Sequence, residues 1–183
     1  MKTRDWIRLV VSWVAFAFAV SLIVFFANLC FGMDWEVSSN TGFGSHHGTS
    51  YWQETLKLKG TGYIYKGVYA GGQIDYTKYS FGHRGSVGFV FGLDWARLWS
   101  LTFYTEGFGG VAVKSGASEL NAKTGLNTLG SGLCGIFGAE TGVRIPLHKR
   151  TQLNIGIGYD HMSSFRSGDK GLNTFGPKIG IRW

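Results

Sequence analysis

Cysteine and proline are scarce in this sequence, and helical periodicity is missing beyond residue 33. The two cysteines, Cys30 and Cys134, provide neither a disulfide framework nor a pair spaced to hold a metal. We expect Cys30 to be removed with an N-terminal segment and Cys134 to be a small apolar residue of the wall. The formal net charge of +7 favours anionic partners, but no cluster of Lys and Arg indicates nucleic-acid binding.

Glycine and aromatic residues are abundant instead. The chain has 29 Gly, 14 Phe, 8 Tyr and 7 Trp, and the glycines follow no collagen period. Together with alternating side-chain character, this composition is typical of closely spaced strands that carry aromatic residues at membrane interfaces. A length of 183 residues suits one domain of this kind.

The N-terminus has the pattern of an export signal. A basic region, residues 1–8, precedes an apolar run over residues 9–27, which is the order found in signal peptides. The sequence therefore predicts a signal peptide over residues 1–32 and one mature domain over residues 33–183. The apolar run is also long enough for an uncleaved membrane anchor. A lipoprotein anchor at Cys30 is disfavoured because the residue before this cysteine is bulky.

Residues beyond 33 alternate in character with a period of two, in segments of about ten residues. The predicted strands cover residues 34–43, 50–58, 63–76, 85–93, 100–113, 131–146, 151–162 and 173–183. The breaks at 59–62, 94–99 and 147–150 are short, and those at 44–49, 77–84, 114–130 and 163–172 are mostly longer and polar. This alternation is typical of bacterial outer-membrane barrels. We predict an all-β fold, an eight-stranded antiparallel transmembrane β-barrel in the bacterial outer membrane. Its filled lumen disfavours a porin function.

The alternation also assigns the two faces of the wall. In each of the last four predicted strands, apolar residues share one parity and charged residues the other, which places them on opposite faces. We expect the apolar face to contact lipid and the charges to pair in the lumen. The predicted lumen charges are Glu106, Glu140, Arg144, Asp160, Lys178 and Arg182. A soluble lipocalin-like barrel would reverse the faces, and the terminal Trp183, which resembles an outer-membrane assembly signal, argues against it.

Three polar side chains follow the lipid-facing parity beside the last predicted loop. His161 and Ser163 continue the outward positions of one strand, and Asn173 continues those of the next strand. Residues two apart on a strand share a face with Cα atoms about 6.5–7 Å apart, a gap that an imidazole can span to a hydroxyl. A base, a nucleophile and an orienting group on this wall suit ester hydrolysis in a lipid. The alternative is an ordinary polar rim, which costs only about 0–1 kcal/mol.

Other candidate sites are weaker. His46 and His47 are adjacent in the first predicted loop, and two neighbouring histidines alone rarely hold a metal. Glu106 and Glu140 could form a catalytic carboxylate pair, but ion pairing in the lumen is the favoured interpretation. The sequence implies no cofactor and no metal site.

The segment YDHMSSFRSGDKGLNTFGPKIGI resembles the C-terminal motif of the lipid A 3-O-deacylase (PagL) family, and FYTEGFGGVAV at 103–113 resembles that family's fifth strand. The resemblance implies an eight-stranded outer-membrane barrel that hydrolyses an ester-linked acyl chain of lipid A. It assigns His161 as the base, Ser163 as the nucleophile and Asn173 as the third member. Lipid A within lipopolysaccharide would be the partner, and the sequence leaves a homodimer open.

Two departures from that family's pattern bear on the mechanism. Where that family's pattern has an acidic third residue, this sequence has Asn173. An amide can orient a histidine but cannot offset the charge of an imidazolium. Replacing the acid by an amide costs roughly 10⁴ in rate in a serine protease. The residues after the serine are Ser164, Phe165 and Arg166 rather than Asn-Ala-Gly, so an oxyanion hole would depend on backbone N–H groups or Ser164. The alternatives are a non-enzymatic barrel for surface binding, adhesion or envelope integrity, and a lipid acyltransferase.

Overall fold

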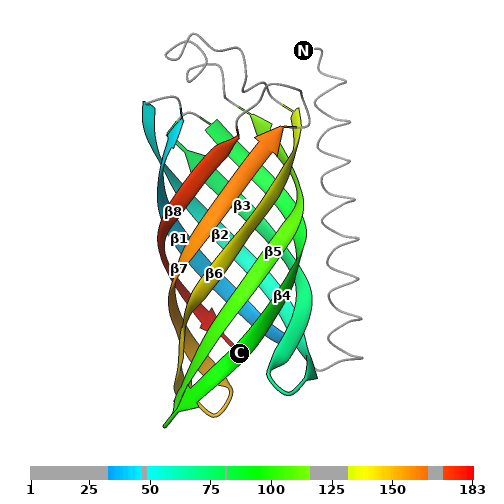
Figure 1. Ribbon diagram of the computed structural model, residues 1–183, viewed down its shortest axis with the longest axis vertical. Coiled ribbons are helices and arrows are strands. Elements are labelled where there is room, and N and C mark those ends of the chain that lie inside the picture. Colours follow the sequence, from blue (N-terminus) through cyan, green and yellow to red (C-terminus); the bar gives the residue numbers. More distant parts are fainter. Residues whose placement is uncertain (1–32, 47–48, 81, 116–131, 165–170) are drawn as a thin grey trace. The chain divides into compact units, whose positions relative to one another are not determined.

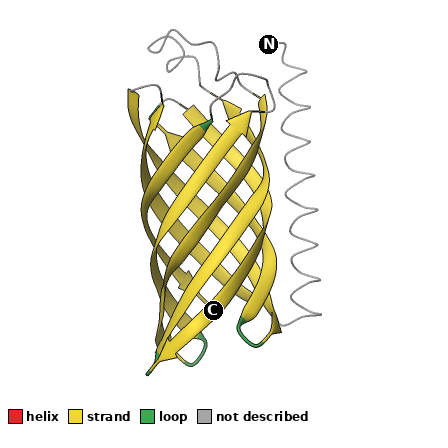
Figure 2. Ribbon diagram, in the orientation of Figure 1, coloured by secondary structure: helices red, strands yellow, loops and turns green. Residues whose placement is uncertain are grey.

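The computed structural model describes residues 33–46, 49–80, 82–115, 132–164 and 171–183. Its strands are β1 (Asp34–His46), β2 (Thr49–Tyr65), β3 (Val68–Tyr79), β4 (Gly82–Leu98), β5 (Leu101–Ser115), β6 (Gly132–His148), β7 (Thr151–Ser164) and β8 (Leu172–Arg182). Neighbours in sequence are neighbours in the sheet, and β1 pairs antiparallel with β8, so the sheet closes (Figures 1 and 2). The predicted eight-stranded antiparallel barrel is confirmed.

The two ends of the barrel differ in their connections. At one end, which we call the turn end, two-residue turns at 66–67, 99–100 and 149–150 join successive strands. The backbones of Trp35 and Trp183 exchange two hydrogen bonds of 2.8 Å at this same end. The other connections lie at the opposite, loop end. Because outer-membrane barrels have short periplasmic turns, the turn end is the periplasmic one.

The predicted signal peptide at residues 1–32 lies outside the described residues, as do the greater parts of the two longest predicted loops. No helix in the described part of the chain is long and apolar enough to cross a bilayer.

The predicted break at residues 59–62 is wrong, because these residues lie inside β2. The glycines there resemble a turn in the sequence, but Lys59 and Thr61 are buried lumen-facing residues that continue the alternation of the strand. Gly60 pairs with Gly72 of β3, so the ladder runs through the predicted break without interruption. A Cβ at Gly71 of β3 would clash with the Gly60 carbonyl oxygen, so glycine permits the close approach of these two strands.

The predicted loop at residues 77–84 is also wrong, since β3 extends to Tyr79 and β4 begins at Gly82. The lumen contains two of the polar residues that suggested a loop, Thr77 and Arg84. Arg84 Nη2 donates to Thr77 Oγ1 at 2.9 Å and lies 3.3 Å from Asp75 Oδ1. These contacts extend the two strands almost to their connection.

The two faces of the wall are as the parity predicted. All six predicted lumen charges are buried inside the barrel. The exterior carries exposed large apolar side chains, among them Phe43, Leu56, Phe89, Phe91, Phe137, Ile155, Ile157, Phe175 and Ile179. An apolar exterior around a charged interior suits lipid and not water, which excludes the lipocalin arrangement. The chain is therefore a transmembrane β-barrel of the outer-membrane type.

The charges in the middle of the lumen are paired. Glu140 forms ion pairs with Lys57 and Lys178, the second at 2.5 Å, and Glu106 pairs with Lys59. Buried charges are costly unless they are paired and hydrogen-bonded, so these contacts explain how the lumen tolerates them. The two glutamates are thus components of an ion-pair network, as favoured from the sequence, and not a free carboxylate pair.

The loop end of the lumen also contains an apolar cluster. The buried cluster there includes Tyr51, Tyr79, Phe108, Ala112, Cys134, Ile136, Met162 and Leu172. Cys134 is fully buried on the lumen side of the wall, and its thiol donates to the Ala112 carbonyl at 3.5 Å. This packing fills the lumen directly behind the outer-wall positions of β7 and β8.

Candidate active site

His161 and Asn173 meet on the outer wall as directly opposed residues of β7 and β8. The distance between His161 Nδ1 and Asn173 Oδ1 is 2.7 Å, a short hydrogen bond. His161 is half-buried and Asn173 is exposed. Both positions have the outward parity that the sequence indicated, and the register brings together the two residues predicted as base and orienting group.

Tyr159 is a third member of this group that sequence reasoning missed. Its hydroxyl donates to Asn173 Oδ1 at 2.6 Å, so this carbonyl oxygen accepts hydrogen bonds from both tyrosine and histidine. A carbonyl oxygen can only accept, so His161 Nδ1 carries the proton and Nε2 is left as the acceptor. Tyr159 shares a face with His161 two residues away, which is the signal in the sequence, although lipid contact alone also accounts for an outward-facing tyrosine.

Ser163 lies on the same face of β7, two residues beyond His161. It is half-buried and pairs across the sheet with Gly135 of β6, so no side chain stands opposite the serine on the outer wall. Among the described residues, no hydrogen bond joins Ser163 to the imidazole. The structure therefore brings base and orienting group into contact and places the serine beside them on the same face.

Gly171 closes the far edge of the imidazole. A Cβ at this position would lie 2.7 Å from His161 Cε1 and 2.9 Å from Nε2, and the backbone has φ +69. Both the space and the left-handed conformation favour glycine here. The backbone just before β8 therefore lies close to His161 Nε2, the nitrogen that can accept a proton.

Phe137 of β6 packs against the opposite side of His161. The two ring centroids are 4.6 Å apart with an interplanar angle of 31°. Phe137 is the cross-strand partner of His161, and the contact limits the orientations available to the imidazole. An aromatic face at this distance also stabilises a cation, which matters if the histidine becomes charged.

The Ser164 side chain, Phe165, Arg166 and His47 lie outside what the structure describes, so the predicted oxyanion hole stays a prediction. The same holds for the His46 side chain. Within the described residues, no group of three or more His, Cys, Asp or Glu side chains could hold a metal ion.

The barrel is similar to solved structures of outer-membrane proteins. One is Neisserial surface protein A, with a TM-score of 0.62, 15% sequence identity, and coverage of 82% of this chain and 96% of that one. Another is the outer membrane enzyme PagL, with a TM-score of 0.58, 18% identity, and coverage of 80% and 97%. No protein-family model and no curated protein matches the sequence. At these identities the likeness shows the fold, which is that of an eight-stranded outer-membrane barrel.

Proposed function

We propose that this barrel is an outer-membrane hydrolase that removes an ester-linked acyl chain from lipid A. The observation that carries the proposal is the Tyr159–Asn173–His161 hydrogen-bond chain on a face where the fold needs none. It fixes the imidazole in the tautomer that a general base requires and lies beside a serine. The resemblance to the lipid A deacylase family supplies the substrate class.

The chemistry follows from the atoms available. His161 Nε2 takes the proton of Ser163 Oγ as this oxygen bonds to the ester carbonyl carbon. The bond from that carbon to the sugar oxygen then breaks, and the histidine returns the proton to the departing hydroxyl. Water repeats the sequence on the acyl-serine and releases the fatty acid. The hydrogen bond between serine and histidine is often long in a substrate-free enzyme and shortens when substrate binds.

The site's position on the barrel favours a lipid substrate. His161 and Ser163 lie at the loop end of β7, among exposed apolar residues of the outer wall, so their reactive atoms face the outer leaflet. An acyl chain in that leaflet can reach them without leaving the membrane. A soluble ester would have to displace lipid from the wall first.

The amide at position 173 makes the proposed base weaker than a carboxylate-supported one. Asn173 orients His161 but cannot offset the charge of an imidazolium. Tyr159 keeps the amide oxygen turned toward the histidine, because a flipped amide would lose two hydrogen bonds. Phe137 offers its ring to the imidazolium. These contacts support activity without supplying a negative charge.

The test is mass spectrometry of lipid A from cells that express the wild-type chain, Ser163→Ala or Ser50→Ala. Ser50 is a matched control, because it is an exposed serine at the loop end of another strand. Equal insertion is verified from the mobility shift of heated and unheated barrels on gels. Loss of one hydroxyacyl mass in the wild type and Ser50→Ala, and not in Ser163→Ala, is the expected result. Unmodified lipid A in all three samples contradicts the proposal, and a gain of mass indicates an acyltransferase.

A second candidate is a non-enzymatic barrel that acts in surface binding, adhesion or envelope integrity. Two observations favour it: within the described residues Ser163 and His161 are not hydrogen-bonded, and the fold is shared with a protein named for the neisserial surface. Under this hypothesis Ser163→Ala changes neither lipid A nor any phenotype of the barrel, whereas changes in the loops do.

A further inference from the structure

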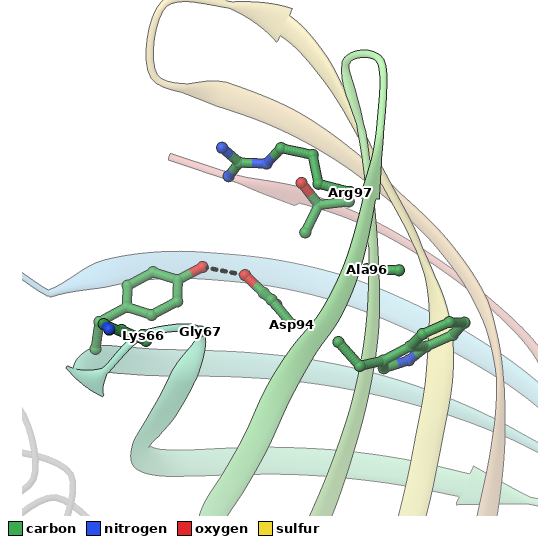
Figure 3. Close-up of a pocket in the computed structure, with 8 residues that line it drawn as sticks. Lys66, Gly67, Asp94, Ala96 and Arg97 are labelled. Carbon is green, nitrogen blue, oxygen red and sulfur yellow. Dashed lines mark hydrogen bonds between the residues drawn. The ribbon is translucent and has the colours of Figure 1, made fainter.

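A pocket at the turn end has no part in the proposed hydrolysis. It has a volume of about 390 Å³ and lies on the far side of the barrel from the β7–β8 loop. The residues that matter for its chemistry are Tyr63, Lys66, Asp94, Trp95, Arg97 and Thr102. Figure 3 shows the labelled Lys66, Asp94 and Arg97 around this pocket.

A β-bulge in β4 directs Arg97 into this pocket. Asp94 pairs with Tyr104 and Ala96 with Phe103, so Trp95 is an extra residue and the parity of β4 reverses after it. Arg97 consequently pairs with the buried, lumen-facing Thr102. Without the bulge, Arg97 would continue the lipid-facing row of β4. The irregularity moves a cation from the membrane face to the mouth of the barrel.

Asp94, the acidic residue of the pocket, already has an ion-pair partner and a hydrogen-bond donor. Asp94 Oδ1 forms an ion pair with Arg144, and Asp94 Oδ2 accepts a 2.6 Å hydrogen bond from the Tyr63 hydroxyl. Lys66 and Arg97 have no ion-pair partner among the described residues; Lys66 Nζ lies 5.5 Å from the centroid of the Tyr65 ring. The pocket therefore presents two cations whose charge no acid of the described barrel neutralises.

Trp95 places the pocket at the level of the membrane interface. Its ring is exposed and packs 5.5 Å from the ring of Phe103, which also faces outward. Tryptophan in this position is typical of the aromatic girdle that lies at the depth of lipid headgroups. Since the turn end is periplasmic, the headgroups at this depth belong to the inner leaflet.

We propose that the pocket binds the phosphate of an anionic glycerophospholipid in the periplasmic leaflet. The Arg97 guanidinium and the Lys66 ammonium would each donate to phosphate oxygens, and the Thr102 hydroxyl lies beside Arg97 as a neutral donor. Trp95 lines the same pocket and is exposed, so in this proposal the acyl chains remain in the bilayer beside it while the headgroup occupies the pocket. This assignment is independent of Ser163 and of any hydrolytic activity.

The test is native mass spectrometry of the full chain in a maltoside detergent, titrated with phosphatidylglycerol or with phosphatidylcholine. The Lys66→Gln/Arg97→Gln double variant is compared with Lys149→Gln/Arg150→Gln, which removes two charges from a neighbouring turn at the same end. All four side chains are exposed, so the substitutions leave the barrel packing unchanged. We expect the pocket variant to bind phosphatidylglycerol about 25-fold more weakly, at about fivefold for each charge near the membrane surface. The turn variant should bind it within about twofold of the wild type, because its charges lie outside the pocket.

Three outcomes overturn the proposal. An equal loss in both double variants means that the basic turn end attracts anionic lipid as a whole and that the pocket is not a site. Complete displacement of the lipid by glycerol 3-phosphate at the same affinity assigns the pocket to a soluble phosphate and not to a lipid. Retained phosphatidylglycerol preference in the pocket variant contradicts it as well.

Discussion

The lumen and the outer wall at the loop end both contain polar side chains, but different constraints explain them. In the lumen, Glu140 is buried against Lys57 and Lys178, and the wall could not close around these groups unless they paired. On the outer wall, His161 and Asn173 are open to the membrane side and hydrogen-bond to each other. The first arrangement is required to fill the barrel and the second is not. Substitutions in the lumen should therefore reduce stability, and those on the wall should reduce activity.

The His161→Ala substitution should separate the effect on activity from the effect on stability most clearly. Without its base the site should lose at least about 10³-fold in deacylation rate, since general-base and triad histidines account for losses of this size or larger. The free energy of unfolding should change by no more than about 1 kcal/mol, because the residue lies near the interface. Release of fatty acid in proteoliposomes and urea titration of the same samples measure both quantities. A variant that keeps its activity would remove His161 from the mechanism.

Glu140→Ala should show the opposite pattern. It removes the nearest acid of Lys57 and breaks one of the ion pairs of Lys178, which still pairs with Glu36 at 2.7 Å. Breaking a buried ion pair typically destabilises by about 3–5 kcal/mol. Glu54→Ala is the control, because Glu54 is an exposed glutamate on the outer face. Urea titration in lipid vesicles should show a large loss of stability for the first variant and almost none for the second. Equal stability of the two would mean that the lumen network contributes nothing to folding.

Asn173→Asp should increase activity, so it tests the outer wall by a gain of function and not by a loss. The carboxylate can still accept from Tyr159 and His161, and it adds the negative charge that an imidazolium lacks beside an amide. The reverse change costs roughly 10⁴ in one serine protease, so an increase of at least about tenfold in kcat is expected here. A decrease in kcat in a correctly inserted barrel would show that the amide itself is required.

Tyr159→Phe should have the smallest effect. It removes one hydrogen bond to Asn173 and leaves the base and nucleophile in place, so kcat should fall about two- to tenfold. Tyr76→Phe is the matched control, since Tyr76 also contacts a histidine on the outer wall, with its hydroxyl 2.9 Å from His83 Nδ1. The ¹⁵N chemical shifts of His161 report its tautomer directly. An unchanged tautomer together with unchanged kcat would make Tyr159 a lipid-contact residue only.

Much of the fold could be predicted from the sequence because period-two alternation reports which side of a wall a residue faces. The rule failed where composition imitated a turn, as at residues 59–62, which continue the ladder between β2 and β3. It also gave no sign of the bulge at Trp95, because an extra residue changes parity without changing composition. Register across strands depends on the whole closed ladder and is not readable from one strand.

The candidate site was predictable in part for the same reason. Parity and the resemblance placed His161, Ser163 and Asn173 on one face, and in the structure His161 and Asn173 are cross-strand partners. The hydroxyl of Tyr159 and the ring of Phe137 reach the site through cross-strand contacts, which alternation along one strand cannot show. The roles of these residues stay predictions until the chemistry is measured.

The most direct test of the central claim is covalent labelling of the serine. The purified barrel is treated with a long-chain alkyl phosphonate ester, which forms a stable bond with a serine that a neighbouring base activates. Intact-mass measurement followed by peptide mapping then identifies the modified residue. We predict one phosphonyl group on Ser163 in the wild type and its loss in His161→Ala. An unlabelled wild-type barrel, or equal labelling in the absence of His161, would contradict the assignment of this wall as an active site.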